Sequence, residues 1–96
     1  MQWIWDPEKN DENWRKHRIS FDTARLVFDD RLHISIEDPY EDEPRTRTFG
    51  MIGQVLVLMV HTWPEIGLRG EELPGRIISA RKATQREREE YEERRR

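Results

Sequence analysis

The run VLVLMV at residues 55–60 constrains the fold of this 96-residue chain more than any other stretch. Successive side chains of a strand point to opposite faces, so six apolar residues in a row predict a central strand that is covered on both sides. The run is far shorter than the roughly 20 residues that a membrane-spanning helix needs. Charged residues make up 39% of the chain, so the surrounding elements must be partly solvated. We expect a single domain over residues 1–96.

The N-terminal third predicts a short strand followed by a helical hairpin. Asp6 is a typical N-cap and Pro7 suits the first helical position, which indicates a helix that ends near His17. Ser20 begins a second helix, whose apolar residues recur at helical spacing and form one buried stripe. The strand and the helices are expected at residues 3–5, 7–17 and 21–28, with the stripe formed by Phe21, Ala24, Val27 and Phe28.

Residues 32–37 alternate strictly between apolar and polar side chains, which predicts a strand. Leu32, Ile34 and Ile36 should face the interior, and His33 should face the solvent.

Turn-forming residues divide the rest of the chain. We expect an acidic turn at residues 38–44, a glycine turn at residues 50–53 and a loop at residues 63–75, which contain two Pro, three Gly and three Glu. Thr84 and Glu87 have the spacing of a capping box and begin the last helix. The predicted elements are strands at residues 32–37, 45–49, 54–62 and 76–82 and a helix at residues 85–96.

These elements, in the order β-α-α-β-β-β-β-α, predict an α+β fold. Short connections make the four later strands an antiparallel meander. The helical hairpin should cover one face of the sheet, and the other face is left for the C-terminal helix and for function.

The net charge of −3 conceals two segments of opposite sign. Residues 29–43 hold seven carboxylates and one Arg, whereas residues 76–96 hold eight cations and five carboxylates. A protein that binds nucleic acid needs only one basic face, so the overall charge does not exclude such a ligand. The acidic segment is then either a loop or a surface that meets a basic partner.

Several classes of chemistry are excluded by residue content. The chain has no Cys, which rules out disulfides, zinc–thiolate sites and thiol nucleophiles. It has no glycine-rich phosphate loop, and its three His lie on different predicted elements. We therefore expect no metal and no cofactor. The lack of Cys and of a signal-peptide motif favours a cytoplasmic protein.

Polar residues gather where predicted strands end. Strict alternation along residues 76–82 puts Ser79 and Arg81 on one face and Arg76 and Lys82 on the other. His61 ends the central strand, and as an antiparallel neighbour it should lie near Arg76. Each of these residues also has an ordinary structural explanation, such as a strand-end charge or a packing residue. On these grounds alone the chain is a small α+β domain with one basic edge.

The string RIISARKAT at residues 76–84, followed by Arg86-Glu87-Arg88 and Tyr91-Glu92, resembles the C-terminal signature of the BrnT toxins of BrnT–BrnA type II toxin–antitoxin systems. The resemblance covers nearly the whole chain, although Arg18 stands where the family usually has Gly. The other matching residues, in chain order, are Trp5-Asp6, Lys9-Asn10, Asn13, Lys16-His17, Ser20-Phe21, Ala24, Val27-Phe28, Arg45, Gly50 and His61-Thr62.

This resemblance implies a RelE-like fold and a ribonuclease that cleaves RNA and halts translation. The implied partner is a BrnA-like antitoxin with a ribbon-helix-helix domain. The pair would form a heterotetramer that represses its own promoter, so this chain would meet DNA only through the antitoxin. The expected catalytic residues are His61 for proton transfer, Arg76, Arg81 and Lys82 for phosphate charge, and Ser79 or Tyr91 for orientation. The expected RNA-binding residues are Lys16, His17, Arg45 and Arg86.

Two other interpretations remain open. In the first, the same polar edge is chiefly a dock for the antitoxin, and catalysis is weak or lost. In the second, the chain is an inert α+β domain whose terminal helix mediates oligomerisation.

Overall fold

The helical hairpin forms close to its predicted bounds. The computed structural model describes residues 1–38 and 42–94, and it begins with a short strand β1 (Trp3–Ile4). Helix α1 (Pro7–His17) is followed by α2 (Phe21–Ala24), which continues as the 3-10 turn η1 (Arg25–Asp29). The Asp6 carboxylate accepts a hydrogen bond from the amide of Glu8 at 2.9 Å, and the Ser20 hydroxyl accepts one from Thr23 at 3.1 Å. Both predicted caps are therefore confirmed.

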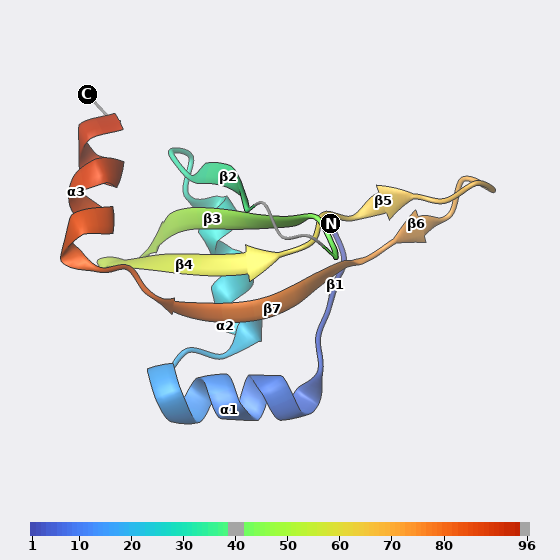
Figure 1. The fold of residues 1–96 in the computed structure, drawn as a ribbon, viewed down its shortest axis with the longest axis horizontal. Coiled ribbons are helices and arrows are strands. Elements are labelled where there is room, and N and C mark those ends of the chain that lie inside the picture. Colours follow the sequence, from blue (N-terminus) through green and yellow to red (C-terminus); the bar gives the residue numbers. More distant parts are fainter. Residues whose placement is uncertain (39–41, 95–96) are drawn as a thin grey trace.

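The sheet confirms the predicted α+β fold and meander. Its strand order is β1-β7-β4-β3-β2 (Figure 1), and all neighbours are antiparallel except β1 and β7. The parallel pairing of β1 was not predicted. The other strands are β2 (Ile34–Asp38), β3 (Arg45–Ile52), β4 (Val55–His61) and β7 (Gly75–Lys82).

Strand β4 is central, and its residues 56–59 are buried on both faces, as the apolar run predicts, whereas Val55 is exposed. Val57 and Met59 pack under the helical hairpin, in a cluster that also holds the stripe residues Phe21, Ala24 and Val27. On the opposite face, Leu56, Leu58 and Phe49 pack with Tyr91, which is the buried residue of the C-terminal helix α3 (Gln85–Arg94).

Two details of the strand predictions are wrong. Leu32 is 47% exposed because it lies in a turn and β2 begins only at Ile34. Gly50 lies inside β3 and not in a turn. A glycine is needed there because a Cβ would stand 2.4 Å from the carbonyl oxygen of Val27. The turn falls instead at Gly53, whose φ is +62°.

Residues 63–75 do not form the predicted loop. They contain two short antiparallel strands, β5 (Glu65–Ile66) and β6 (Glu72–Leu73), which form a hairpin of their own. This hairpin projects away from the body of the molecule (Figure 1). Of the predicted acidic turn, residues 39–41 lie outside the described residues, as do residues 95–96 of the predicted last helix. No helix in the described part of the chain is long and apolar enough to cross a membrane.

Candidate functional site

A bulge in β7 decides which side chains share a face of the sheet. Ser79 pairs with Val60 and Ile77 pairs with His61, so Ile78 is an extra residue opposite β4. The alternation therefore reverses between Ile77 and Ser79, and Ile77 joins Ala80 in the cluster beneath the helices. Strict alternation would put Ile77 on the same face as Ser79, whereas the bulge puts the two side chains on opposite faces.

The same bulge brings Arg76 to the face of Ser79 and Arg81. Arg76 precedes Ile77 in the strand and so points away from the helices, as do Ser79 and Arg81 beyond the bulge. The predicted separation of Arg76 from Ser79 and Arg81 is wrong, because strict alternation takes no account of an inserted residue.

Strand β3 adds two further arginines to this face. Thr46 and Thr48 are buried toward the helices, so the alternate residues Arg45 and Arg47 point the other way. Arg47 lies opposite Val60, which in turn lies opposite Ser79, so one row of side chains crosses three strands. Helix α3 stands at one end of the strands (Figure 1), and its Tyr91 packs with Phe49, Leu56 and Leu58 and not with this row. We call this part of the sheet the open sheet face: Arg45, Arg47, Val60, Arg76, Ser79 and Arg81.

The guanidinium of Arg81 is held in a fixed position. Its Nη1 and Nη2 donate to the two carboxylate oxygens of Glu87 at 2.8 and 3.1 Å, and Nη1 also donates to the carbonyl of Lys82 at 3.2 Å. The hydrogen bonds that Arg81 donates to Glu87 raise the pKa of Arg81 and lower the pKa of Glu87 to about 2. Bidentate pairing leaves the cation little freedom to reorient.

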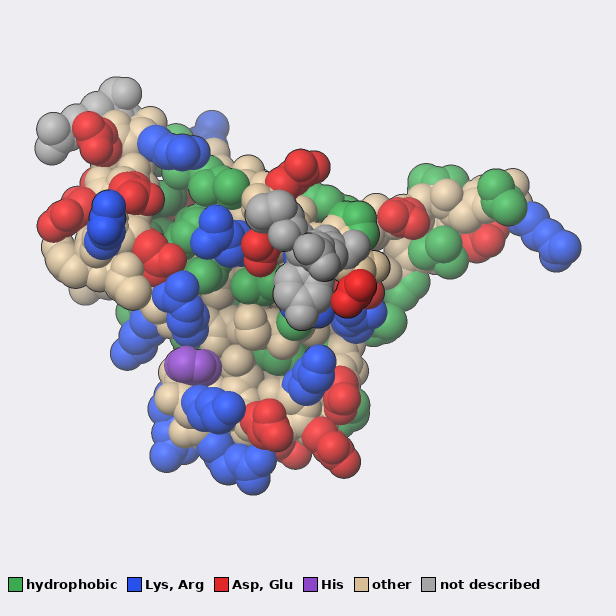
Figure 2. Space-filling view, in the orientation of Figure 1, with side chains coloured by type: hydrophobic (Ala, Val, Ile, Leu, Met, Phe, Trp, Pro, Cys, Tyr) green, Lys and Arg blue, Asp and Glu red, His purple; other side chains and the backbone are tan. Residues whose placement is uncertain are grey.

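A basic groove continues from the open sheet face across the edge of β7 onto α1. A hollow of about 520 Å³ is lined by Lys16, His17, Arg18, Arg81, Lys82 and Thr84. A neighbouring hollow of about 250 Å³ is lined by Lys9, Glu12, Asn13, Lys16, His17, Ile78 and Ser79. Figure 2 shows Lys and Arg side chains around a histidine over α1 and the adjoining strand. The predicted residues Lys16, His17, Ser79, Arg81 and Lys82 are thus brought together, in an arrangement suited to phosphate groups.

Helix α1 is held at the groove by Asn13, which is buried. Its Oδ1 accepts a hydrogen bond from the amide of Ala80 in β7 at 3.1 Å, and its Nδ2 donates to the carbonyl of Ile19 at 2.8 Å. One side chain therefore covers part of the edge of β7 and fixes the turn after α1. This contact sets the distance across the groove.

His61 lies in the interior and not on the open sheet face. Its side chain is fully buried, with Nε2 at 2.7 Å from the Thr48 hydroxyl and Nδ1 at 3.0 Å from the Thr62 carbonyl oxygen. Aromatic rings of Trp3, Phe28 and Trp63 surround it. Burial lowers its pKa, although the hydrogen bond to Thr62 acts in the opposite direction. His61 pairs with Ile77, the neighbour of Arg76, so the predicted nearness to Arg76 holds for the backbone. The two side chains, however, lie on opposite faces of the sheet.

Besides Arg45, which lies on the open sheet face and lines neither hollow of the groove, three other candidates from the sequence are not brought to the groove. Tyr91 is 3% exposed, and its hydroxyl donates to the carboxylate of Asp30. Arg86 has a side chain that is 91% exposed, and it lies 3.9 Å from Glu90. Arg76, although on the open sheet face, forms an ion pair with Glu43.

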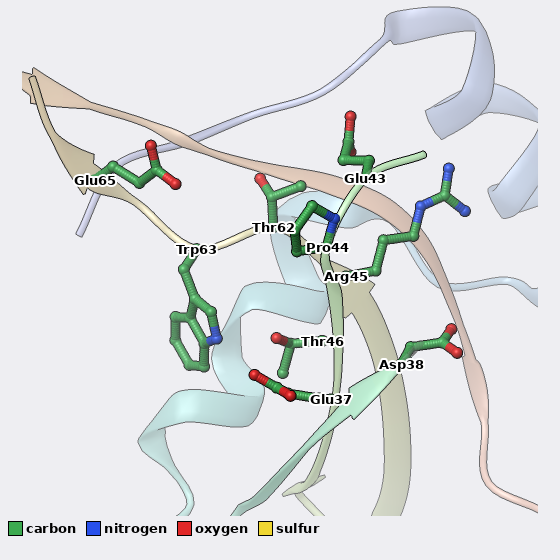
Figure 3. A pocket seen from close by; sticks show the side chains of 9 residues that line it. All are labelled: Glu37, Asp38, Glu43, Pro44, Arg45, Thr46, Thr62, Trp63 and Glu65. Atoms are coloured by element: carbon green, nitrogen blue, oxygen red, sulfur yellow. The ribbon is translucent and has the colours of Figure 1, made fainter. Parts of the chain in front are cut away.

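A separate, acidic hollow of about 660 Å³ lies at the far end of the sheet, near the base of the β5–β6 hairpin. Figure 3 shows its lining, in which carboxylates surround Thr46, Thr62 and the ring of Trp63. Carboxylates repel phosphate, so this hollow does not suit a nucleic acid. Its lining residues are Glu37, Asp38, Glu43, Pro44, Arg45, Thr46, Thr62, Trp63 and Glu65.

Sequence reasoning missed Arg47, Arg18 and Lys9 as members of the basic surface. Arg47 could have been predicted, since period-two alternation places it on the same face as Arg45. Arg18 and Lys9 depend on how α1 lies against β7, which no local pattern reveals. Among residues 1–38 and 42–94, no group of three or more acidic or His side chains is placed to hold a metal ion.

Comparison with known families gives one match. A family model described as "Ribonuclease toxin, BrnT, of type II toxin-antitoxin system" matches residues 5–87. No curated protein matches the chain.

Proposed function

The chain belongs to the BrnT family of ribonuclease toxins of type II toxin–antitoxin systems, and from this premise we propose that it cleaves RNA at the open sheet face and the basic groove. Arg81 supports this assignment most directly. It lines the groove, is clamped by Glu87 and shares the sheet face with Arg47, Arg76 and Ser79. A cation held in place before the substrate arrives does not have to reorient as charge develops, which is the condition for strong electrostatic stabilisation.

The proposed reaction needs no metal. The ribose 2′-oxygen attacks the adjacent phosphorus, the bond from phosphorus to the 5′-oxygen breaks, and the products are a 2′,3′-cyclic phosphate and a 5′-hydroxyl. One proton leaves the 2′-hydroxyl and one reaches the 5′-oxygen. Arg81 and Lys82 stabilise the negative charge on the non-bridging oxygens, and Lys16 contacts the RNA backbone.

We assign proton transfer to His17 in place of His61. His17 is exposed and lines both hollows of the groove, whereas His61 is fully buried on the other side of the sheet. Imidazole is the side chain best suited to exchange protons near neutral pH. Tyr91 is likewise omitted from the proposed site, because its hydroxyl is bound to Asp30 inside the molecule.

The biological setting follows from the family. We propose that cleavage occurs in the cytoplasm and inhibits translation, and that a ribbon-helix-helix antitoxin of the BrnA type neutralises it. We also propose that the two proteins form a heterotetramer that represses its own promoter, with the antitoxin contacting the DNA.

Cleavage of an end-labelled RNA by the purified chain tests the site. Wild type should cut in the presence of EDTA and leave a 2′,3′-cyclic phosphate. Arg81→Ala should slow cleavage about 100-fold, since removing one preorganised donor has an effect of that order. Arg25→Ala is the matched control, because Arg25 is a half-exposed arginine on η1 paired with Asp22, and it should cut within about twofold of wild type.

Two outcomes would contradict the proposal. If wild type cuts no RNA, the chain is at most a module that binds its antitoxin. If Arg81→Ala cuts as fast as wild type, the reaction takes place elsewhere. His17→Ala tests the proton-transfer assignment separately, and it should slow cleavage about 100-fold, since a positioned general acid or base contributes at least that much.

A further inference from the structure

The β5–β6 hairpin exposes more apolar surface than an unpartnered hairpin of a small domain should. Ile66 is 70% exposed, Leu73 is 42% exposed, and Leu68 at the turn is completely exposed. Trp63, where the chain enters the hairpin, is 42% exposed. An isolated two-stranded hairpin is only marginally stable in water, and clustered exposed apolar residues mark interaction sites.

The surroundings of the hairpin are acidic. Glu65 and Glu72 belong to its two strands, and Glu65 also lines the acidic hollow at its base, together with Glu37 and Asp38. This charge is opposite to that of the basic groove. It excludes RNA as the occupant and favours a protein segment that combines apolar side chains with Lys or Arg.

The backbone of the hairpin is also available. Within the described residues, β5 and β6 pair only with each other, so each strand keeps one free edge. An extended segment of a partner can add to such an edge through main-chain hydrogen bonds, while its side chains reach the flanking surface.

We propose that the β5–β6 hairpin and the acidic hollow at its base dock a basic, partly apolar segment of the antitoxin. The inference rests on the proposed function in one respect, namely that the partner is an antitoxin. A second copy of this chain fits less well, because a symmetric contact would bring the same carboxylates of both hairpins together. The acidic hollow shares Arg45 with the open sheet face but shares no residue with the basic groove, so changes confined to the hairpin should affect neutralisation and leave RNA cleavage intact.

Binding of the full chain to its cognate antitoxin, followed by calorimetry, tests the dock. Ile66→Ser/Leu68→Ser should weaken binding at least tenfold, since these are the most exposed apolar residues of the hairpin. Leu32→Ser is the matched control, because Leu32 is 47% exposed in a turn outside the hairpin, and it should bind within about twofold of wild type. Glu65→Gln/Glu72→Gln should weaken binding and reduce its dependence on salt.

A single substitution at the turn provides a second test in a variant that is expected to keep the hairpin folded. Leu68→Arg replaces a completely exposed side chain and opposes a basic segment, so it too should weaken binding at least tenfold. All hairpin variants should cut RNA within about twofold of wild type.

The inference is overturned if the serine and arginine variants bind the antitoxin as tightly as wild type. It is also overturned if wild type alone forms dimers that Leu68→Arg dissociates, because the occupant is then a second copy. Failure of the proposed function is a different result: wild type would bind the antitoxin through the hairpin and yet cut no RNA.

Discussion

His61 shows how one residue can have the right identity for a catalytic role and the wrong location. Its ring contacts Trp3 and Phe28 and is hydrogen-bonded to the buried Thr48. Its pKa is lowered because burial disfavours the charged form of the ring. We interpret it as a packing and hydrogen-bonding residue.

Replacing His61 by Ala should therefore affect stability and not chemistry. The change leaves a cavity and removes a hydrogen-bond partner from Thr48, so the free energy of unfolding should fall by about 3 kcal/mol in urea denaturation. RNA cleavage, measured below the unfolding transition, should stay within about threefold of wild type. A 100-fold loss of cleavage in the folded variant would return His61 to the reaction.

Arg18 has a strained backbone conformation. It is the C-cap of α1 with φ 57° and ψ 32°, a left-handed conformation that favours glycine, and its guanidinium lies 5.6 Å from the centre of the Trp14 ring. Arg18→Gly should raise the free energy of unfolding by about 0.5–1 kcal/mol, even though the cation–π contact is lost. Arg15→Gly, inside the same helix, should lower it by about 1 kcal/mol. Equal effects of the two changes on thermal unfolding would show that Arg18 is not strained.

At the scale of elements, α3 depends on its first turn. Apart from Tyr91 it has little apolar surface, so its attachment relies on Glu87, which accepts from the Thr84 amide at 2.8 Å and from Arg81. Glu87 is ordinarily protonated below about pH 4.5, but its pKa in the folded protein is about 2. A carboxylate with a lowered pKa stabilises the folded state above its unfolded pKa, and this contribution is lost as the pH falls through the folded pKa.

Comparison of wild type with Glu87→Gln should reveal this dependence. The difference in their free energies of unfolding should be constant above about pH 4.5 and should shrink as the pH falls toward about 2. Chemical denaturation across that range measures it, and pairwise subtraction removes the titration of the other carboxylates. A difference that does not change with pH would mean that Glu87 makes no special contribution.

At the scale of the whole molecule, the two signs of charge occupy different surfaces. The chain has a formal charge of −3, yet the basic groove presents Lys16, Arg18, Arg81 and Lys82 together. The acidic hollow and the hairpin lie at the other end of β7, where Gly75 begins the strand. RNA and a basic protein partner can thus be attracted to separate places on one small domain.

RNA affinity should accordingly depend strongly on salt despite the negative net charge. For about four neutralised phosphates, binding should weaken about 50-fold between 50 and 200 mM salt. Fluorescence anisotropy with an RNA that carries a 2′-deoxy nucleotide at the cleavage position measures this without turnover. Lys82→Ala should reduce the slope, and Leu68→Arg should not. A salt-independent affinity would contradict phosphate binding in the groove.

The sequence predicted the features that are encoded locally. The caps at Asp6, Ser20 and Thr84 and the central position of β4 all follow from short-range spacing and side-chain type. Asn13 was noted only as a residue that matches the family, and its structural role was not predicted, because a polar residue on a surface helix looks solvated until its tertiary partners are known.

The remaining errors concern pairing between distant segments. The two-residue strands of the hairpin lie in a segment that contains two Pro and three Gly, and only their mutual hydrogen bonds identify them. The bulge in β7 depends on the register with β4 and leaves no mark in the alternation of residues 76–82. The residue types of the candidate site were therefore predicted more successfully than the directions in which their side chains point.

The bulge also determines how β7 can change in length during evolution or design. Removal of Ile78 would leave Ile77 next to Ser79 and still opposite His61, so the pairing would become regular and Arg76 and Ile77 would keep their directions. Removal of any other residue between Gly75 and Lys82 would instead need a new register for the residues on one side of it. A one-residue gap at Ile78 in a related sequence would therefore mark a β7 strand without the bulge whose arginine still lies on the open sheet face.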